Sequence, residues 1–288
     1  MKKFTEAKLE EAFIALLAKE GYPHHSGTTL NRAVGEVLLE DDLRAFLLAK
    51  YKKEQLTTVE LDRIILQLKI LPSSDLYQSN KRFMSWLSNG FVLKREDRKQ
   101  KDIWIYLVDY TQESNNLYKF VNQLEIVGTE KRIPDGILYI NGLPLVVFEF
   151  KSAIREETTL HSAYEQLTVR YQRDIPQLFI YNAFCVISDG VNTKAGSFFA
   201  SYEFFYAWRR VSGLAKEVEG INSLFTLVQG MLHKKRFLDI LCNFIYLPDS
   251  SKKEEKILCR YPQYYAARAL YENIKLAQKN TDGTGGDG

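Results

Sequence analysis

The chain has 288 residues, a formal net charge of +3 and a hydrophobic content of 45%, which is typical of a globular protein with one large domain or two modest ones. The charge is too small to establish a polyanionic partner, although a locally basic groove is compatible with it. The three cysteines lack metal-ligand spacing and are odd in number, which argues against a zinc-cysteine site and a disulfide scaffold. No stretch is as long as a membrane span. We therefore expect reduced thiols in a cytoplasmic protein.

The first third of the chain has helical periodicity. Apolar residues recur at helical spacing over Thr5–Lys19, and Gly21 ends that pattern. Mostly helical sequence follows from about Gly27 to Leu87, with Pro72 as a terminator within it.

Strand-like segments come next, each bounded by Gly, Pro or Asn: GFVLKRED, KDIWIYLVDY, YKFVNQLEIVG, RIPDGILYI and PLVVFEFKSA. Successive strand signals without helices between them predict antiparallel pairs. A helix over Thr158–Gln172, a buried strand in LFIYNAFCVISDG and helices from about Lys216 are expected afterwards. This order predicts an α/β or α+β fold around one mixed sheet.

The last eight residues, TDGTGGDG, are polar and rich in glycine. Such a composition is typical of a linker. We therefore expect the chain to be a fragment of something longer.

A carboxylate and an ammonium interrupt the apolar strand that begins at Leu145. Because side chains alternate along a strand, Glu149 and Lys151 should share one face while Phe150, between them, packs on the other. Mg²⁺ prefers hard oxygen ligands and usually takes only one or two protein carboxylates. Asp135 and Glu149, with the carbonyl of Phe150, are candidate metal ligands, and Lys151 is a candidate for orienting the attacking water of a phosphodiester hydrolase.

The metal site depends on the register of the hairpin around Asn141-Gly142, a strong turn signal. A regular two-residue loop pairs Asp135 with Phe148 and turns Asp135 away from Glu149. A three-residue loop pairs Asp135 with Glu149 on one face. The hypothesis therefore requires an odd loop or a bulge.

A second interpretation stays open on these residues alone. Glu149 and Lys151 can form a surface ion pair while Asp135 sits in a turn. Against this, the carboxylate interrupts a strand that otherwise has the composition of a protein core, where an unpaired charge is costly.

The segment PDGILYINGLPLVVFEFKSA resembles the PD-(D/E)xK nuclease motif, with Asp135, Glu149 and Lys151 at its three positions. Nearly the whole chain is similar to the N-terminal part of the R subunit of type I restriction-modification enzymes, including LPSSDLYQSNKRFMSWLSNGFVLKRED, VNQLEIVG and YNAFCVISDGVNTKAGSF. The resemblance implies a restriction-endonuclease-like α/β core, with a central mixed sheet flanked by helices, an inserted N-terminal helical region and C-terminal helices.

The resemblance also implies supporting residues. An acidic residue of the first helix completes the site, for which Glu10 is the best candidate, with Glu6 and Glu11 as alternatives. A Gln-x-x-x-Tyr motif follows the lysine in that family. Here Gln166 is present, but Tyr171 lies five positions on, and residues i and i+5 of an α-helix are not neighbours. We therefore do not expect Tyr171 to share the role of Gln166; it should instead meet the DNA backbone or simply pack.

Further residues are candidates for nucleic-acid contact. Arg170, Tyr171 and Arg173 follow Gln166 and can meet the DNA backbone. Lys94, Arg95, Arg98, Lys99 and the HKKR segment at 233–236 are basic, although a solvated surface is the ordinary role of such stretches. Gln263 in RYPQYYAARALYENI resembles the glutamine motif that contacts adenine ahead of a helicase motor.

The domain organisation implied by the resemblance has three parts. Residues 1–215 form the nuclease domain with its helical insertion at about 27–90, residues 216–248 are connecting helices, and residues 249–288 begin the motor. The chain contains no G-x-x-x-x-G-K-[ST] loop.

The implied function is that of a type I site-specific deoxyribonuclease. It is Mg²⁺-dependent, with Mn²⁺ as a substitute, and uses ATP only in the full-length subunit. Its expected partners are double-stranded DNA and the methyltransferase (M) and specificity (S) subunits. A non-catalytic DNA-binding or docking module of the same complex is the alternative. For either function, we expect the protein to lie in the cytoplasm of a bacterium or an archaeon.

Overall fold

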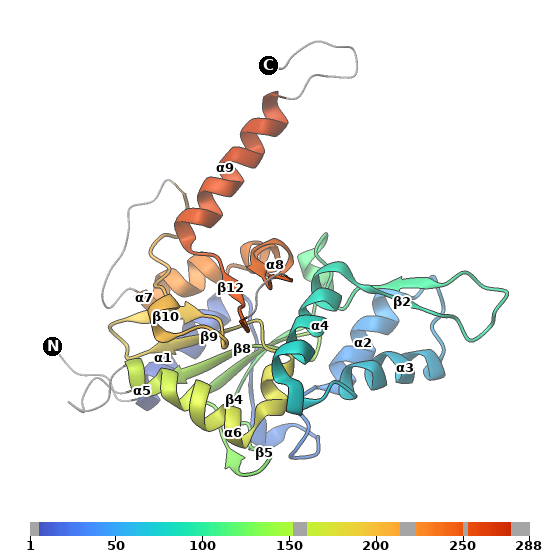
Figure 1. Cartoon of the computed structure of the whole chain (residues 1–288), viewed down its shortest axis with the longest axis horizontal. Helices are drawn as coiled ribbons and strands as arrows, with labels where there is room; N and C mark the ends of the chain where they lie inside the picture. Colours follow the sequence, from blue (N-terminus) through green and yellow to red (C-terminus); the bar gives the residue numbers. More distant parts are fainter. Residues whose placement is uncertain (1–5, 152–159, 214–222, 250–252, 278–288) are drawn as a thin grey trace.

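The computed structural model describes residues 6–151, 160–213, 223–249 and 253–277. Its centre is a six-stranded sheet in the order β1-β4-β7-β8-β9-β10, with helices on both faces (Figure 1). The strands are β1 His24–Ser26, β4 Tyr118–Asn122, β7 Gly136–Ile140, β8 Leu143–Phe150, β9 Phe184–Ser188 and β10 Thr193–Gly196. The pairs β1–β4 and β8–β9 are parallel and the others antiparallel. The predicted α/β fold around one mixed sheet is confirmed.

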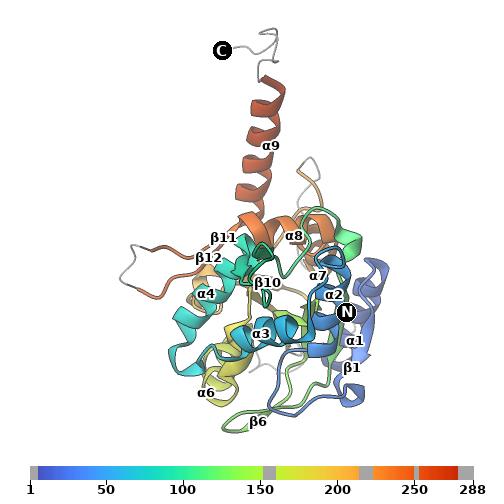
Figure 2. The ribbon, with the colours of Figure 1, turned by 90° about the vertical axis from the view of Figure 1, so that its right-hand side faces the viewer.

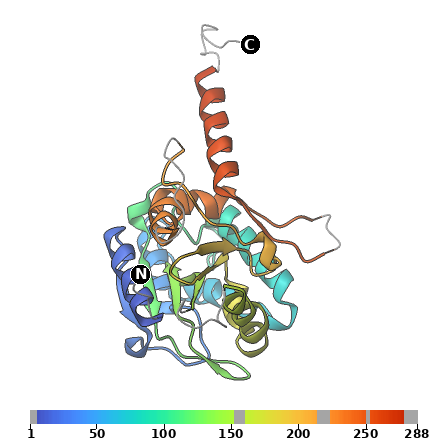
Figure 3. The same ribbon diagram turned by 90° about the vertical axis from the view of Figure 1, so that its left-hand side faces the viewer.

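The two faces of the sheet are covered by helices that lie far apart in the sequence. Helix α1 (Glu6–Lys19) places Phe13 against the rings of Phe120, Phe148 and Phe150, at centroid distances of 4.8–5.4 Å. The opposite face is covered by α5 (Leu160–Glu165), a π-helix (Gln166–Tyr171) and α6 (Gln172–Asp174). Figure 3 shows α1 in blue and the later helices in yellow on the two sides of the strands. Strands β7 and β8 are buried along their whole length as a result.

The predicted helical insertion consists of α2 (Glu40–Lys50), α3 (Thr58–Lys69) and α4 (Leu76–Asn89), beside the sheet (Figure 1). Short 3₁₀ helices precede α2 and α4, at Gly27–Thr29 and Ser73–Asp75. Helix α3 begins with a capping box, in which Thr57 and Glu60 bond each other's backbone N–H groups.

Two strand pairs form separate ribbons outside the central sheet. One consists of β2 (Phe91–Leu93) and β3 (Ile103–Ile105), so most of KDIWIYLVDY is not strand. The other consists of β5 (Ile126–Val127) and β6 (Lys131–Arg132). Further 3₁₀ turns occupy Glu113–Asn115, Pro176–Ile180 and Tyr202–Phe204.

The last part of the described chain contains α7 (Ser223–Thr226), a second π-helix (Leu227–Met231), α8 (Lys234–Asn243), β11 (Ile245–Tyr246), β12 (Ile257–Leu258) and α9 (Tyr261–Ala277). Helix α9 projects from the body of the molecule (Figure 2). The predicted boundary at residue 215 and the glycine-rich end fall in residues 214–222 and 278–288, outside the described residues. The three-part domain division therefore stays a prediction.

No helix in the described ranges is long and apolar enough to cross a membrane.

Candidate active site

The hairpin between β7 and β8 sets the geometry of the site. Asn141 and Gly142 have φ angles of 52° and 78°, so both central residues are left-handed and the loop has two residues. Ile140 then pairs with Leu143 and Tyr139 with Pro144, but Leu138 pairs with Val146. Leu145 is the extra residue of a β-bulge. The predicted need for an odd loop or a bulge is thus met by a bulge within β8.

The bulge changes the partner of Asp135. Beyond it Gly136 pairs with Phe148, and the same register places Asp135 opposite Glu149. The carboxylate of Asp135 accepts a hydrogen bond from the backbone N–H of Phe150 at 2.6 Å. A Cβ atom on Gly136 would lie 2.3 Å from the ring of Phe120, so this position requires glycine. The structure therefore brings Asp135 and Glu149 together.

Glu149 is fully buried and has a partner on each carboxylate oxygen. Lys151 Nζ donates to Oε1 at 2.6 Å, and the Tyr171 hydroxyl donates to Oε2 at 3.0 Å. The Lys151 side chain is 13% exposed, so it reaches solvent from a mostly buried position. The alternation predicted from the strand, with Glu149 and Lys151 on the face opposite Phe150, is confirmed by these contacts.

The pKa values of both carboxyl groups are raised, because their charged forms are destabilised. Burial raises the pKa of Glu149 to about 8, and the charge of Asp135 raises it too, against the effect of Lys151 and Tyr171. Burial likewise raises the pKa of Asp135 to about 6, opposed by the Phe150 N–H and Lys151 and assisted by the charges of Glu10 and Glu6. Two acids that destabilise each other's charge form a place where a cation would be favourable.

These residues suit a divalent cation of the Mg²⁺ type. No cluster of three or more His, Cys, Asp or Glu side chains able to hold a metal occurs among the residues that the structure describes. Mg²⁺ does not require one, because it usually takes one or two carboxylates and completes its shell with water and phosphate. Each carboxylate oxygen can accept more than one bond, so the contacts of Glu149 do not close the site.

The expectation that Gln166 and Tyr171 would not meet is wrong. The segment Gln166–Tyr171 is a π-helix, whose hydrogen bonds run from residue i to residue i+5. This winding stacks the two side chains, and Gln166 Nε2 donates to the Tyr171 hydroxyl at 2.9 Å. Tyr171 is 1% exposed, and its hydroxyl in turn donates to Glu149 Oε2. An extra residue between Gln and Tyr is thus absorbed by the helix geometry.

Glu10 reaches the region of Asp135 from α1. It is half-buried, whereas Glu6 and Glu11 are exposed. Its Oε1 accepts a 2.6 Å hydrogen bond from Asn122 Nδ2, and Asn122 Oδ1 is 2.8 Å from His24 Nε2. Asn122 belongs to the predicted strand VNQLEIVG, and no feature of the sequence distinguished it. Its contact with Glu10 could be found only from the packing of α1 on β4.

The basic candidates have different environments. Arg170 and Arg173 are exposed and line a cavity of about 300 Å³ together with Gln166 and Tyr171. Lys94 is exposed, but the Arg95 side chain is 6% exposed and bonds Glu60 at 2.8 Å and the carbonyl of Glu54 at 2.8 Å. The guanidinium of Arg95 is therefore paired within the protein rather than presented to solvent.

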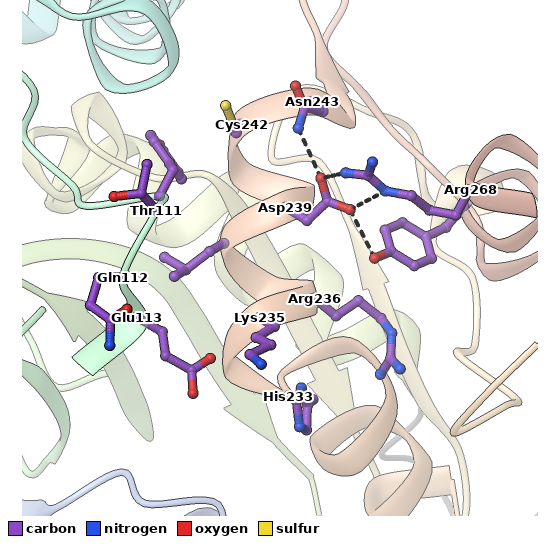
Figure 4. Close-up of a pocket in the computed structure, with 13 residues that line it drawn as sticks. Thr111, Gln112, Glu113, His233, Lys235, Arg236, Asp239, Cys242, Asn243 and Arg268 are labelled. Atoms are coloured by element: carbon purple, nitrogen blue, oxygen red, sulfur yellow. Dashed lines mark hydrogen bonds and ion pairs between the residues drawn. The ribbon is translucent and has the colours of Figure 1, made fainter. Parts of the chain in front are cut away.

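The HKKR segment lines a different cavity, of about 790 Å³, between α8, α9 and the turn at Glu113 (Figure 4). Arg236 donates to the carbonyls of Gln229 and Gly230, so this member of the basic segment supplies hydrogen bonds to backbone carbonyls of the second π-helix. Asp239 binds Arg268 and accepts a 2.8 Å bond from the Tyr264 hydroxyl, which fixes α9 on α8.

Gln263 is exposed at the start of α9. Its Oε1 accepts a bond from the Arg260 N–H at 2.8 Å, so the side chain caps this helix.

Comparison with known proteins places these features in context. Residues 3–204 match a protein family described as "Type I restriction enzyme R protein N terminus". This range includes the whole central sheet and every residue of the candidate site.

Individual relatives agree with this match. The type I restriction enzyme HindI endonuclease subunit of Haemophilus influenzae is 32% identical over 257 residues, which cover 87% of this chain and 24% of that protein. The putative MjaIXP endonuclease subunit of Methanocaldococcus jannaschii is 27% identical, covering 93% and 27%. The SsaAORF53P subunit of Staphylococcus saprophyticus is 24% identical, covering 96% and 28%. The chain spans about a quarter of the length of these relatives.

Proposed function

This chain belongs to the family of the type I restriction enzyme R protein N terminus, and on that basis we propose that it is a Mg²⁺-dependent endonuclease region that hydrolyses DNA phosphodiester bonds. The observation that carries the proposal is the convergence of Asp135 and Glu149 beside Lys151. The buried Glu149, the half-buried Asp135 and one lysine are the groups that metal-assisted phosphodiester hydrolysis needs.

Each residue has a role in this proposal. Asp135, Glu149 and the backbone carbonyl of Phe150 would hold the metal, which when bound would polarise the phosphate and lower the pKa of a water. Lys151, which reaches solvent beside Glu149, orients that water and balances negative charge. Asp135 is held in place by the Phe150 N–H at 2.6 Å.

Three further residues support the metal ligands. Gln166 bonds Tyr171, and Tyr171 bonds Glu149, so this pair fixes the orientation of the carboxylate. Groups that orient a metal ligand tune its affinity for the metal. Glu10 adds a third acidic group near Asp135, whose charge would also favour a bound cation.

The wider activity follows the family. We propose that the full-length subunit is a type I site-specific deoxyribonuclease of the cytoplasm, that Mn²⁺ can replace Mg²⁺, and that an ATP-driven motor, which residues 249–288 begin, brings the nuclease to its cut. The M and S subunits would then select the double-stranded DNA. Arg170, Arg173 and Lys94 are the exposed candidates for phosphate contact, and Gln263 for an adenine.

A non-catalytic docking or DNA-binding module is the second candidate. One observation favours it: Lys151 Nζ bonds Glu149 Oε1 at 2.6 Å, a contact that is sufficient to hold both side chains in a purely structural role. In that case the three motif residues would serve only to stabilise the sheet.

A divalent-metal titration of the chain separates the two candidates. We expect Mg²⁺ or Mn²⁺ to give a saturable calorimetric signal that Glu149→Ala abolishes, because the substitution removes one of two carboxylate ligands. Glu11→Ala, on the exposed side of α1, is the matched control and should titrate like the wild type. Equal signals from the wild type and Glu149→Ala would support the docking module.

Cleavage is best measured in the full-length subunit reconstituted with its M and S partners. Lys151→Ala should abolish DNA cleavage while ATP is still consumed. Cleavage at the wild-type rate by Lys151→Ala would show that this lysine is not catalytic.

A further inference from the structure

A basic groove opens directly beside the candidate active site. It is the cavity of about 300 Å³ whose polar lining is Lys131, Arg132, Gln166, Arg170, Tyr171 and Arg173. Its floor is continuous with the nuclease centre, because the Tyr171 hydroxyl donates to Glu149 at 3.0 Å. A ligand in this groove would therefore lie next to the bond that Glu149 and Lys151 are proposed to act on.

A buried carboxylate holds two of the arginines in the groove. The Asp174 side chain is 1% exposed, and its Oδ2 accepts from Arg132 Nε at 2.7 Å and from Arg132 Nη2 at 2.6 Å. Arg173 donates to the same carboxylate from Nε at 2.7 Å and from Nη2 at 3.0 Å. The bonds from Arg173 and Arg132 lower the pKa of Asp174 to about 2, so the carboxylate is charged at neutral pH.

The backbone reinforces this arrangement. Thr129 N–H donates to the Asp174 carbonyl at 2.9 Å, and a Cβ atom on Gly128 would lie 2.1 Å from the same oxygen. The β5–β6 ribbon thus docks on the end of α6 through a contact that requires glycine. This docking carries Arg132 to the position where Asp174 can bind it together with Arg173.

The charges of the groove suit an extended anion. One carboxylate is shared by two guanidinium groups, so the pair retains positive charge, and the Arg132 and Arg173 side chains stay 33% and 66% exposed. Arg170 is exposed and has no ion-pair partner among the described residues. Lys131 is paired with Glu125 at the outer edge, at 3.0 Å between exposed side chains, and Glu130 lies near Arg173. Oriented guanidinium groups along a groove match the spaced phosphates of a nucleic-acid strand.

We propose that this groove binds the phosphate backbone of duplex DNA next to the cleaved bond, and that Asp174 is the positioning residue that presents Arg132 and Arg173 to it. The inference rests on the proposed nuclease function and adds to it the surface that aligns the substrate. Asp174 does not touch DNA in this account; it acts through the two arginines.

Substitution of Asp174 distinguishes a carboxylate that only repels phosphate from one that positions the arginines, because the two predict opposite changes in DNA affinity. If the carboxylate only repels phosphate, Asp174→Asn adds net positive charge and should tighten DNA binding. If it positions the arginines, the same substitution should weaken binding roughly threefold or more despite the added charge, since oriented phosphate contacts are lost. Binding of the 288-residue chain to a labelled 30-base-pair duplex would be followed by fluorescence anisotropy in EDTA, over a series of salt concentrations.

The arginines provide the matching variants. Arg132→Gln and Arg170→Gln should each weaken binding roughly threefold to tenfold and reduce the salt slope by about one unit, because each removes one phosphate contact. Arg63→Gln, an exposed arginine on α3, removes the same charge elsewhere and should change affinity less than twofold. Circular dichroism would verify folding, and the exposed Arg170 keeps the test decisive if Asp174→Asn does not fold.

The outcomes separate this inference from the proposed function. Equal or tighter binding by Asp174→Asn, wild-type binding by Arg132→Gln and Arg170→Gln, or no duplex binding by the wild-type chain at low salt would overturn the groove while leaving metal-dependent cleavage intact. Groove-dependent binding together with no metal-dependent cleavage would instead support the groove and refute the nuclease.

Discussion

Adjacent basic residues differ in what solvates their charge. Lys94 is exposed to water, whereas Arg95 points inward, and its Nε is 2.8 Å from the Glu60 carboxylate, whose side chain is 1% exposed. Glu60 also accepts from the N–H groups of Thr57 and Glu96 at 3.0 and 2.9 Å. Burial alone would raise the pKa of Glu60, but these donors and Arg95 outweigh it and lower the pKa. The Glu60 carboxylate is therefore charged, and Arg95 balances that charge inside the protein.

Arg95→Ala should destabilise the fold by about 3 kcal/mol, because breaking a buried pair leaves the other charge uncompensated. Lys94→Ala should change the free energy of unfolding by less than about 0.5 kcal/mol, as is usual for an exposed position. Urea denaturation of both variants measures the difference. Equal effects on stability would contradict the structural role of Arg95, and so would a selective loss of DNA binding in Arg95→Ala without loss of stability.

At the scale of elements, the helix over residues 160–174 shows how one extra residue is accommodated. A π-helical segment of six residues lies between α5 and α6 and keeps the flanking turns in phase with the sheet. Such segments are rare and less favourable than α-helix, and they often occur at functional sites. Here the result is the contact from Gln166 to Tyr171 and from Tyr171 to Glu149.

Deletion of Val169, which is 59% exposed, should convert this segment to α-helix. Gln166 and the tyrosine would then be four positions apart, where side chains of an α-helix are neighbours, so the bond to Glu149 should survive. We expect unchanged or higher thermal stability and metal affinity within about threefold of the wild type.

Deletion of Gln172, just after the π-helix, is the control. It cannot be absorbed in the same way and should rotate α6 and displace Asp174, with loss of stability. If both deletions were equally damaging, the π-helix would not be acting as the buffer for the extra residue.

At the scale of the whole molecule, Lys256 connects three distant parts of the chain. It precedes β12, is 2% exposed, and donates to Asn80 Oδ1 of α4 at 3.0 Å and to the carbonyl of Asn182, before β9, at 2.5 Å. No carboxylate accepts from its ammonium among the described residues. Burial lowers the pKa of Lys256 to about 7, with the nearby Cys185 thiol opposing. The segment before β12 is thus anchored to α4 and to the residues before β9 by a lysine whose charged form is destabilised by burial.

This lysine should make stability depend on pH. Below pH 7 both folded and unfolded chains are protonated there and the full cost of the buried charge applies. Between pH 7 and the ordinary pKa of lysine, near ~10.4, the unfolded chain binds a proton that the folded chain has lost, so stability rises with pH by at most about 1.4 kcal/mol per unit from this group.

Lys256→Met should stabilise the protein at pH 6.5 and remove this rise, whereas Lys52→Met, at an exposed position, should leave the wild-type pH dependence in place. Urea denaturation between pH 6.5 and 9.5 measures both. A parallel pH dependence in Lys256→Met and the wild type would refute the assignment.

Much of the fold was predictable because its causes are local. The alternation that separates Glu149 and Lys151 from Phe150 follows from strand geometry, and the turn at Asn141-Gly142 follows from the left-handed conformation that these residue types adopt. The helical insertion and the helix of residues 6–19 follow from the spacing of their apolar residues. Asp135, Glu149 and Lys151 were singled out as candidates by the charges that interrupt an apolar strand and by the resemblance to a nuclease motif.

Register and helix phase were decided only by the tertiary structure. The bulge at Leu145 and the π-helix at Gln166–Tyr171 each insert one residue into a regular pattern, and their local cost is offset by contacts with residues far away in the sequence. The same holds for which charges are buried, as in Arg95 and Asp174. Local sequence patterns therefore predicted the elements and the candidate site residues, and long-range packing determined how these residues meet.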